Sequence, residues 1–67
     1  MNPQIRVEFS FADGSTKEPW LLAPSLAALV PLVGDFIGVD ERNYQVTQRW
    51  LDLSNPQELF VELVCEP

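Results

Sequence analysis

Two hydrophobic, β-rich runs flank four polar, turn-forming residues in the C-terminal third of the chain. Residues 44–53 (YQVTQRWLDL) and 58–64 (ELFVELV) are rich in aromatic, β-branched and leucine side chains, and the turn-forming residues 54–57 (SNPQ) separate them. Aromatic and β-branched residues suit the half-buried surface of a sheet. The pattern therefore predicts a long hairpin over residues 44–64.

The first strand of this hairpin changes parity halfway along. Tyr44 and Val46 would share one face of an unbroken strand, whereas Leu51 and Leu53 would fall on the other face. A one-residue shift moves every side chain of a strand to the opposite side of the sheet. We therefore expect a β-bulge near Gln48 or Arg49, which would turn both pairs inward. Without a bulge, Trp50 would point inward with Tyr44 and Val46.

The N-terminal residues alternate with a period of two, so that Ile5, Val7, Phe9 and Phe11 should face the core. Asp13 and Gly14 then form a strong hairpin signal. A second strand is expected from about residue 16 to residue 22. It should lie at an edge of the sheet because Pro19 has no N–H to donate.

Residues 23–39 allow two interpretations. Their apolar positions Leu26, Leu29, Val30, Val33 and Ile37 have helical spacing. A proline inside a helix, however, costs about 3 kcal/mol, and Pro31 lies in the middle of this segment. We therefore favour a short helical turn near residues 25–30 and a strand over 36–39. The alternative is a kinked helix over about 25–37.

These elements predict a single small domain, residues 1–67, of the mainly β class. We expect a five-stranded antiparallel β-barrel or rolled sheet, SH3-like, with one short helical turn. The alternative is an α+β fold with a helix packed on a four-stranded antiparallel sheet. Residues 31–37 and 44–50 resemble small bacterial and phage β-barrels, in which a Pro-x-x-Gly-Asp turn precedes a short strand and a Tyr-x-Val strand follows. No functional residue is carried over from that resemblance.

The composition of the chain argues against catalysis and metal binding. It has no His, and its one cysteine, Cys65, is expected to be a buried, inert thiol. We expect no catalytic residue, no metal site and no cofactor.

The formal net charge of −6 argues against direct nucleic-acid binding and favours a basic partner. With no signal peptide and no long apolar span, we expect a cytoplasmic protein that does not contact membranes.

A chain of 67 residues is too short to enclose all of its large hydrophobic side chains. In the last strand, Leu59, Val61, Leu63 and Cys65 share the core face, which leaves Phe60 and Val64 on the other face. We expect an exposed apolar patch that binds another protein or a second copy of the chain, and the candidate partner-binding residues are Leu21, Trp50, Phe60 and Val64.

This patch favours a non-enzymatic protein-interaction module, either an accessory subunit or an inhibitor of a larger protein. Two alternatives stay open. The chain could be an acidic mimic of nucleic acid that occupies a basic groove, because it is small and negatively charged. It could also be a homo-oligomeric structural protein with no ligand.

Overall fold

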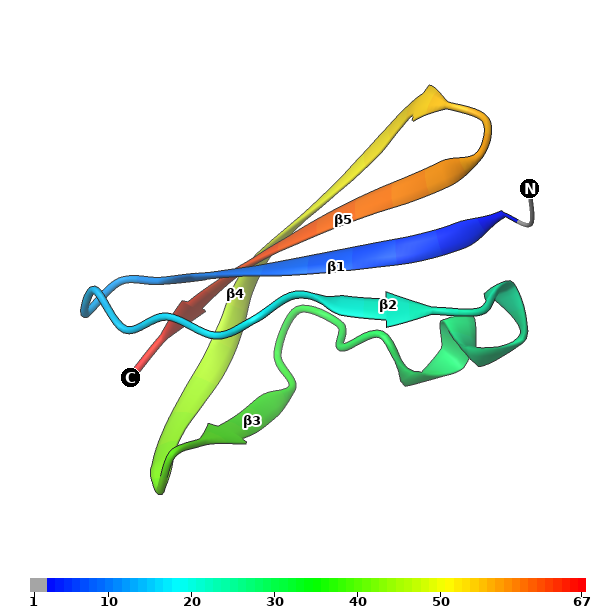
Figure 1. Ribbon diagram of the computed structural model, residues 1–67. Coiled ribbons are helices and arrows are strands. Elements are labelled where there is room, and N and C mark those ends of the chain that lie inside the picture. The colour runs from blue at the N-terminus through cyan, green and yellow to red at the C-terminus, as the bar shows by residue number, and fades with distance from the viewer. Residues whose placement is uncertain (1–2) are drawn as a thin grey trace.

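The predicted hairpin forms the long axis of the molecule. The computed structural model describes residues 3–67 (Figure 1), with strands β1 (Gln4–Phe11), β2 (Trp20–Leu22), β3 (Phe36–Val39), β4 (Arg42–Asn55) and β5 (Glu58–Glu66). A 3-10 helix, η1 (Pro24–Leu29), follows β2. The strands form one sheet in the order β2-β1-β5-β4-β3. This sheet rolls into a half-barrel, which confirms the mainly β, SH3-like prediction.

Strand β5 lies at the centre of the sheet, between β4 and β1. It pairs antiparallel with β4, as a hairpin must, but parallel with β1, from Gln4 opposite Glu58 to Phe11 opposite Cys65. The sheet is therefore mixed, and the expectation of a wholly antiparallel sheet is corrected. The reason is that the intervening elements return the chain to the end where β1 began. There the N–H of Gln4 donates to the carbonyl of Gln57 at 3.1 Å.

The second strand is shorter than the predicted residues 16–22. Only Trp20–Leu22 pair with β1, antiparallel, while residues 15–19 have no regular structure. The turn at Gly14 does form, with φ at +83°, a conformation that favours glycine. After this turn, Pro19 cannot donate to the ladder, which is consistent with pairing that begins only at Trp20.

The segment after β2 follows the favoured interpretation rather than the long helix over 25–37. Helix η1 ends at Leu29, and Val30 is extended, with φ −68° and ψ 123°. This is the conformation that the residue before a proline prefers. The chain then turns at residues 33–34, where the N–H of Leu32 donates to the Asp35 carboxylate at 2.8 Å. It continues into β3, as predicted.

The core occupies the concave side of the rolled sheet. Its side chains come mainly from alternate positions of β1, β4 and β5, as the period of two predicts. The buried hydrophobic residues are Ile5, Val7, Phe11, Val30, Tyr44, Val46, Val61, Leu63 and Cys65. Phe9, Trp20, Leu22, Ile37, Val39 and Leu59 pack against them and are partly buried.

The expected bulge is present at the middle of β4. Val46 lies opposite Cys65 and Gln48 lies opposite Val64, which leaves Thr47 as the extra residue. The bulge places Leu51 opposite Val61 and therefore on the core side of the sheet. It also turns Trp50 to the convex side, opposite Glu62.

Candidate protein-interaction surface

The convex side of the sheet, called the outer face here, carries all four of the candidate partner-binding residues. The strand registers arrange it in rows that run across the sheet. One row is Leu21, Arg6, Phe60 and Asp52, taken from β2, β1, β5 and β4. The next row is Glu8, Glu62 and Trp50, and the following row is Ser10, Val64 and Gln48.

The structure brings two of the four residues close together and separates the others. Trp50 and Phe60 occupy neighbouring rows on adjacent strands, a diagonal relation within reach of aromatic side chains. Arg6 lies between Leu21 and Phe60, so Leu21 forms a separate apolar site at the β2 edge. Val64 lies beyond Glu62 on the same strand. Leu21 and Trp50 are 58% and 63% exposed, whereas Phe60 and Val64 are half-buried.

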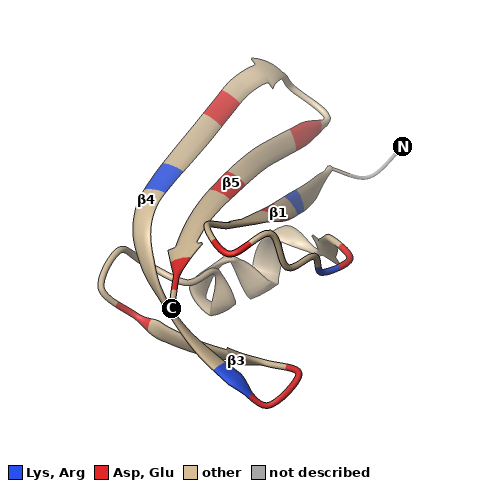
Figure 2. Cartoon of the chain, turned by 90° about the vertical axis from the view of Figure 1, so that its left-hand side faces the viewer, with Lys and Arg blue, Asp and Glu red and all other residues tan. Residues whose placement is uncertain are grey.

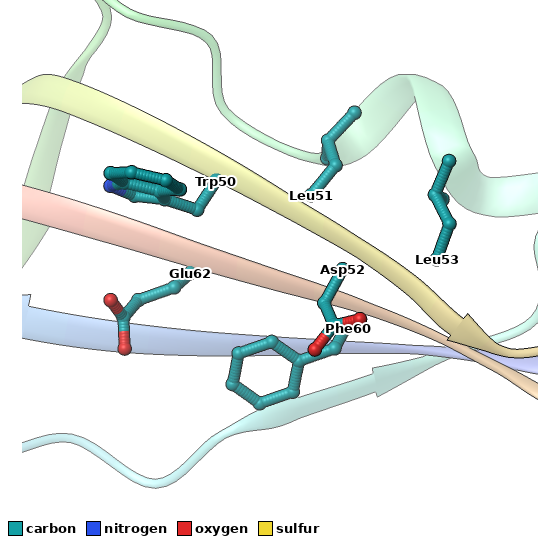
Figure 3. A pocket seen from close by; sticks show the side chains of 6 residues that line it. All are labelled: Trp50, Leu51, Asp52, Leu53, Phe60 and Glu62. Carbon is teal, nitrogen blue, oxygen red and sulfur yellow. The ribbon is translucent and has the colours of Figure 1, made fainter.

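Trp50 and Phe60 border a shallow hollow beside the hairpin tip (Figure 3). In this view Trp50, Glu62, Asp52 and Phe60 lie on one side of the hairpin, while Leu51 and Leu53 point to the opposite side. Aromatic surface is therefore placed between two carboxylates, both carried by rigid strands. Such a hollow could hold an apolar side chain, and the carboxylates of Asp52 and Glu62 at its rim can accept hydrogen bonds from the polar groups beside that side chain.

The charge around Trp50 is predominantly negative. Glu8 and Glu62 lie directly opposite each other on β1 and β5, an arrangement that destabilises a sheet when both are ionised. The guanidinium of Arg6 lies 3.8 Å from the Glu8 carboxylate. Near the hairpin tip, hydrogen bonds from the Ser54 side chain and backbone N–H lower the pKa of Asp52 below its usual value. Figure 2 shows acidic positions along β4, β5 and several loops.

Two exposed leucines on the opposite side of β4 were expected to be inward and buried. Leu51 and Leu53 are 49% and 75% exposed, although the bulge does turn Leu51 to the core side. The burial expected for this pair is wrong because β4 extends beyond the elements that could cover it. Strand length is the cause, since the 14 residues of β4 cannot all be covered by the four residues of β3.

An apolar hollow lies between η1 and the hairpin tip on this concave side. Pro24 and Ala27 of η1 face it from one direction, and Leu53, Pro56 and Leu59 face it from the other. No side chain of the described residues fills it. The hydrophobic surplus that the composition predicts is therefore present on both sides of the hairpin tip.

The groups with potential for chemistry are few. Burial raises the pKa of the Cys65 thiol, and its side chain is fully enclosed, as predicted. Within residues 3–67, no group of three His, Cys, Asp or Glu side chains is arranged to hold a metal ion. In the same part of the chain, no helix is long and apolar enough to cross a membrane.

Comparisons of the chain with protein families, with curated proteins and with solved structures found no match. The geometry of the outer face and of the hairpin tip is therefore the basis for assigning a function.

Proposed function

We propose that this chain is a non-enzymatic protein-interaction module, an accessory subunit or inhibitor that binds a larger protein through its outer face. The partner presents an apolar side chain to Trp50 and Phe60 and basic side chains to the surrounding carboxylates. The single observation that carries this proposal is the position of Trp50, which is 63% exposed on a rigid strand directly beside Glu62.

Two physical arguments support a basic, apolar partner. First, tryptophan is among the residues that contribute most binding energy at interfaces, and it also attracts cations to its ring face. Second, the carboxylates of Glu8 and Glu62, which lie directly opposite each other, repel one another in the free protein. An Arg or Lys from a partner would relieve that repulsion and stack on Trp50. The net charge of −6 would also speed encounter with a positive surface.

Affinity purification from the native host, followed by mass spectrometry, tests this proposal. The bait is the whole chain, compared with Trp50→Ala and with Phe36→Ala as a matched control. Phe36 is also an exposed aromatic residue, but it lies on β3, away from the Trp50 hollow. We expect a host protein that the wild type and Phe36→Ala recover and that Trp50→Ala loses. Recovery that is equal for all three baits would contradict the proposal.

The salt dependence of capture and its dependence on Trp50 separate this function from that of a nucleic-acid mimic. A mimic relies on charge alone, so its recovery should collapse at high salt and should not depend on Trp50. The interaction module should lose association rate with salt but keep most of its apolar contribution. Glu62→Lys should weaken capture while leaving the fold intact, because its side chain lies on the outer face.

A further inference from the structure

The second half of β4 is an edge of the sheet with no neighbour. Strand β3 pairs with β4 only up to Gln45, and the main chain of Val46 then bonds with Gly34 and Asp35. Beyond this point, residues 47–55 pair with β5 alone among the described residues. These nine residues are called the free edge. Figure 2 shows this half of β4 extending past the other edge elements.

The free edge has less protection than a sheet edge usually has: irregularities at Thr47 and at residues 53–54 flank it, but the strand is regular from Gln48 to Asp52. Alternate N–H and C=O groups of an edge strand face outward and are ready to pair with another strand. Residues 47–55 (TQRWLDLSN) contain no proline and no lysine, and their large apolar side chains are exposed. The opposite edge, β2, differs because it has only three residues and follows Pro19. The edge formed by residues 47–55 is therefore less protected than the edge formed by β2.

We infer that the free edge pairs with the free edge of a second copy of this chain, antiparallel, so that two sheets join into one. Charge favours this occupant. The chain as a whole repels its copies through its net charge of −6, but residues 47–55 contain one Arg and one Asp and are locally neutral. Two such edges can therefore approach each other without the repulsion that other surfaces of the chain would produce.

Symmetry and charge select the register of this pairing. Two identical antiparallel strands are related by a two-fold axis through one residue, because opposite residues must share a face. An axis through Arg49 or Asp52 would place like charges directly opposite. Between its irregularities at Thr47 and at residues 53–54, β4 is regular from Gln48 to Asp52, and the midpoint of that stretch is Trp50. The axis therefore passes through Trp50.

In this register the side chains complement one another. Trp50 lies opposite Trp50 of the second copy, an aromatic cross-strand pair that stabilises antiparallel sheets. Gln48 lies opposite Asp52, so that its amide N–H can donate to the carboxylate. On the concave side, Arg49 lies opposite Leu51 of the second copy. The Arg49 Nε atom, buried and without a hydrogen-bond partner in the single chain, lies beside this new interface.

Molecular mass in solution tests the inference. We expect the wild type to sediment at twice the 7.6 kDa of the chain and to dissociate on dilution. Leu51→Lys, a lysine on the free edge, should raise the dissociation constant at least about tenfold. Leu21→Lys makes the same change at another exposed leucine and should leave the dimer intact. A wild type that stays monomeric at every concentration, or a Leu51→Lys dimer of unchanged affinity, would overturn the inference.

A disulfide trap tests the register. In a Cys65→Ala background, Trp50→Cys places two thiols directly opposite, at a Cα separation of about 4.5–5.5 Å that a disulfide can span. Leu53→Cys is the matched control, because its two copies would be about 20 Å apart at 3.3 Å per residue. Oxidation should crosslink Trp50→Cys and not Leu53→Cys. Crosslinking of Leu53→Cys alone would reject this register.

The inference goes beyond the proposed function, since the free edge pairs through its main chain and the partner protein contacts side chains of the outer face. A monomeric wild type would overturn edge pairing only. Equal capture of host protein by wild type and Trp50→Ala would overturn the proposed function only.

Discussion

The two halves of β4 have similar hydrophobic residues and opposite environments. Tyr44 and Val46 in the first half are 2% and 1% exposed, whereas Leu51 and Leu53 in the second half are 49% and 75% exposed. The first half has β5 on one side and β3 on the other, and Phe11 packs over it with its ring centroid 4.7 Å from that of Tyr44. The second half has β5 alone.

This difference shows that hydrophobic side chains on one strand are buried only where other elements cover them. The bulge at Thr47 keeps Tyr44, Val46 and Leu51 on the same side of the sheet, so orientation does not explain the contrast. Coverage explains it, because η1 and the loop before β3 end before they reach the hairpin tip. The uncovered half is where the chain offers both apolar side chains and main-chain hydrogen-bonding groups to another molecule.

The largest effect on stability is expected from a pair of leucine-to-alanine variants, one at a buried position and one at an exposed position. Leu63→Ala opens a cavity in the core, where this β5 side chain is fully buried, and should cost about 2–5 kcal/mol of unfolding free energy. Leu53→Ala in the exposed half should change stability by less than about 0.5 kcal/mol at concentrations where the chain is monomeric. Urea denaturation of both variants measures this. Equal costs would contradict the difference in burial.

The hydroxyl of Tyr44 provides the next largest effect. It donates to the Asp13 carboxylate at 2.9 Å and lies 3.0 Å from the Ser15 hydroxyl, which fastens the loop after β1 to the first half of β4. Tyr44→Phe should therefore cost about 1–2 kcal/mol. In a double-mutant cycle with Asp13→Asn, the two losses should be less than additive. Full additivity would show that the two side chains do not act together.

A glycine substitution in the turn between β3 and β4 should stabilise the fold. Asp40 and Glu41 both have positive φ, at 50° and 66°, a conformation that Gly, Asn and Asp adopt readily and that is unfavourable for Glu. Glu41→Gly should raise the unfolding free energy by about 1 kcal/mol. Glu41→Ala, which keeps a Cβ atom, is the control and should not stabilise the fold. Thermal unfolding of the two variants gives the comparison.

Acid should lower the stability of the fold by protonating Asp13, which accepts a hydrogen bond from Tyr44 in the first half of β4. Hydrogen bonds from the Ser15 backbone N–H and side chain, and then from Tyr44, hold the pKa of Asp13 below its usual 3.8. A carboxyl with a lowered pKa in the folded state stabilises the fold above its usual pKa, and this contribution is lost as the pH falls through the folded-state value. Asp13→Asn should therefore flatten the fall in stability below about pH 4. If the unfolding free energy of Asp13→Asn falls with pH as steeply as that of the wild type, Asp13 does not cause the loss of stability in acid.

Much of the fold was predictable because its signals are local. The period of two in residues 5–11, the turn at 54–57, the proline at position 31 and the parity change before Leu51 each predict a feature that is present. The parallel pairing of β1 with β5 was not predictable in this way, since it depends on where the intervening segments return the chain. The late start of β2 at Trp20 is consistent with Pro19, which has no N–H to donate to the ladder.

The candidate surface was predictable in its residues but not in its extent. Face parity placed Phe60 and Val64 on the side away from the core, and the bulge added Trp50 to that side. The exposure of Leu53 and the free edge depend on the relative lengths of β3 and β4, which no periodicity encodes. Tertiary coverage, rather than strand propensity, decides which half of β4 is available for binding.

Amide hydrogen exchange along β4, measured over a wide range of protein concentration, tests the central claim most directly. We predict that the Tyr44 and Val46 amides are protected at every concentration. The outward amides of residues 47–55 should exchange rapidly in dilute protein and become protected as concentration rises. Protection of residues 47–55 that is already complete in dilute protein would contradict the account, as would exchange there that stays rapid at every concentration.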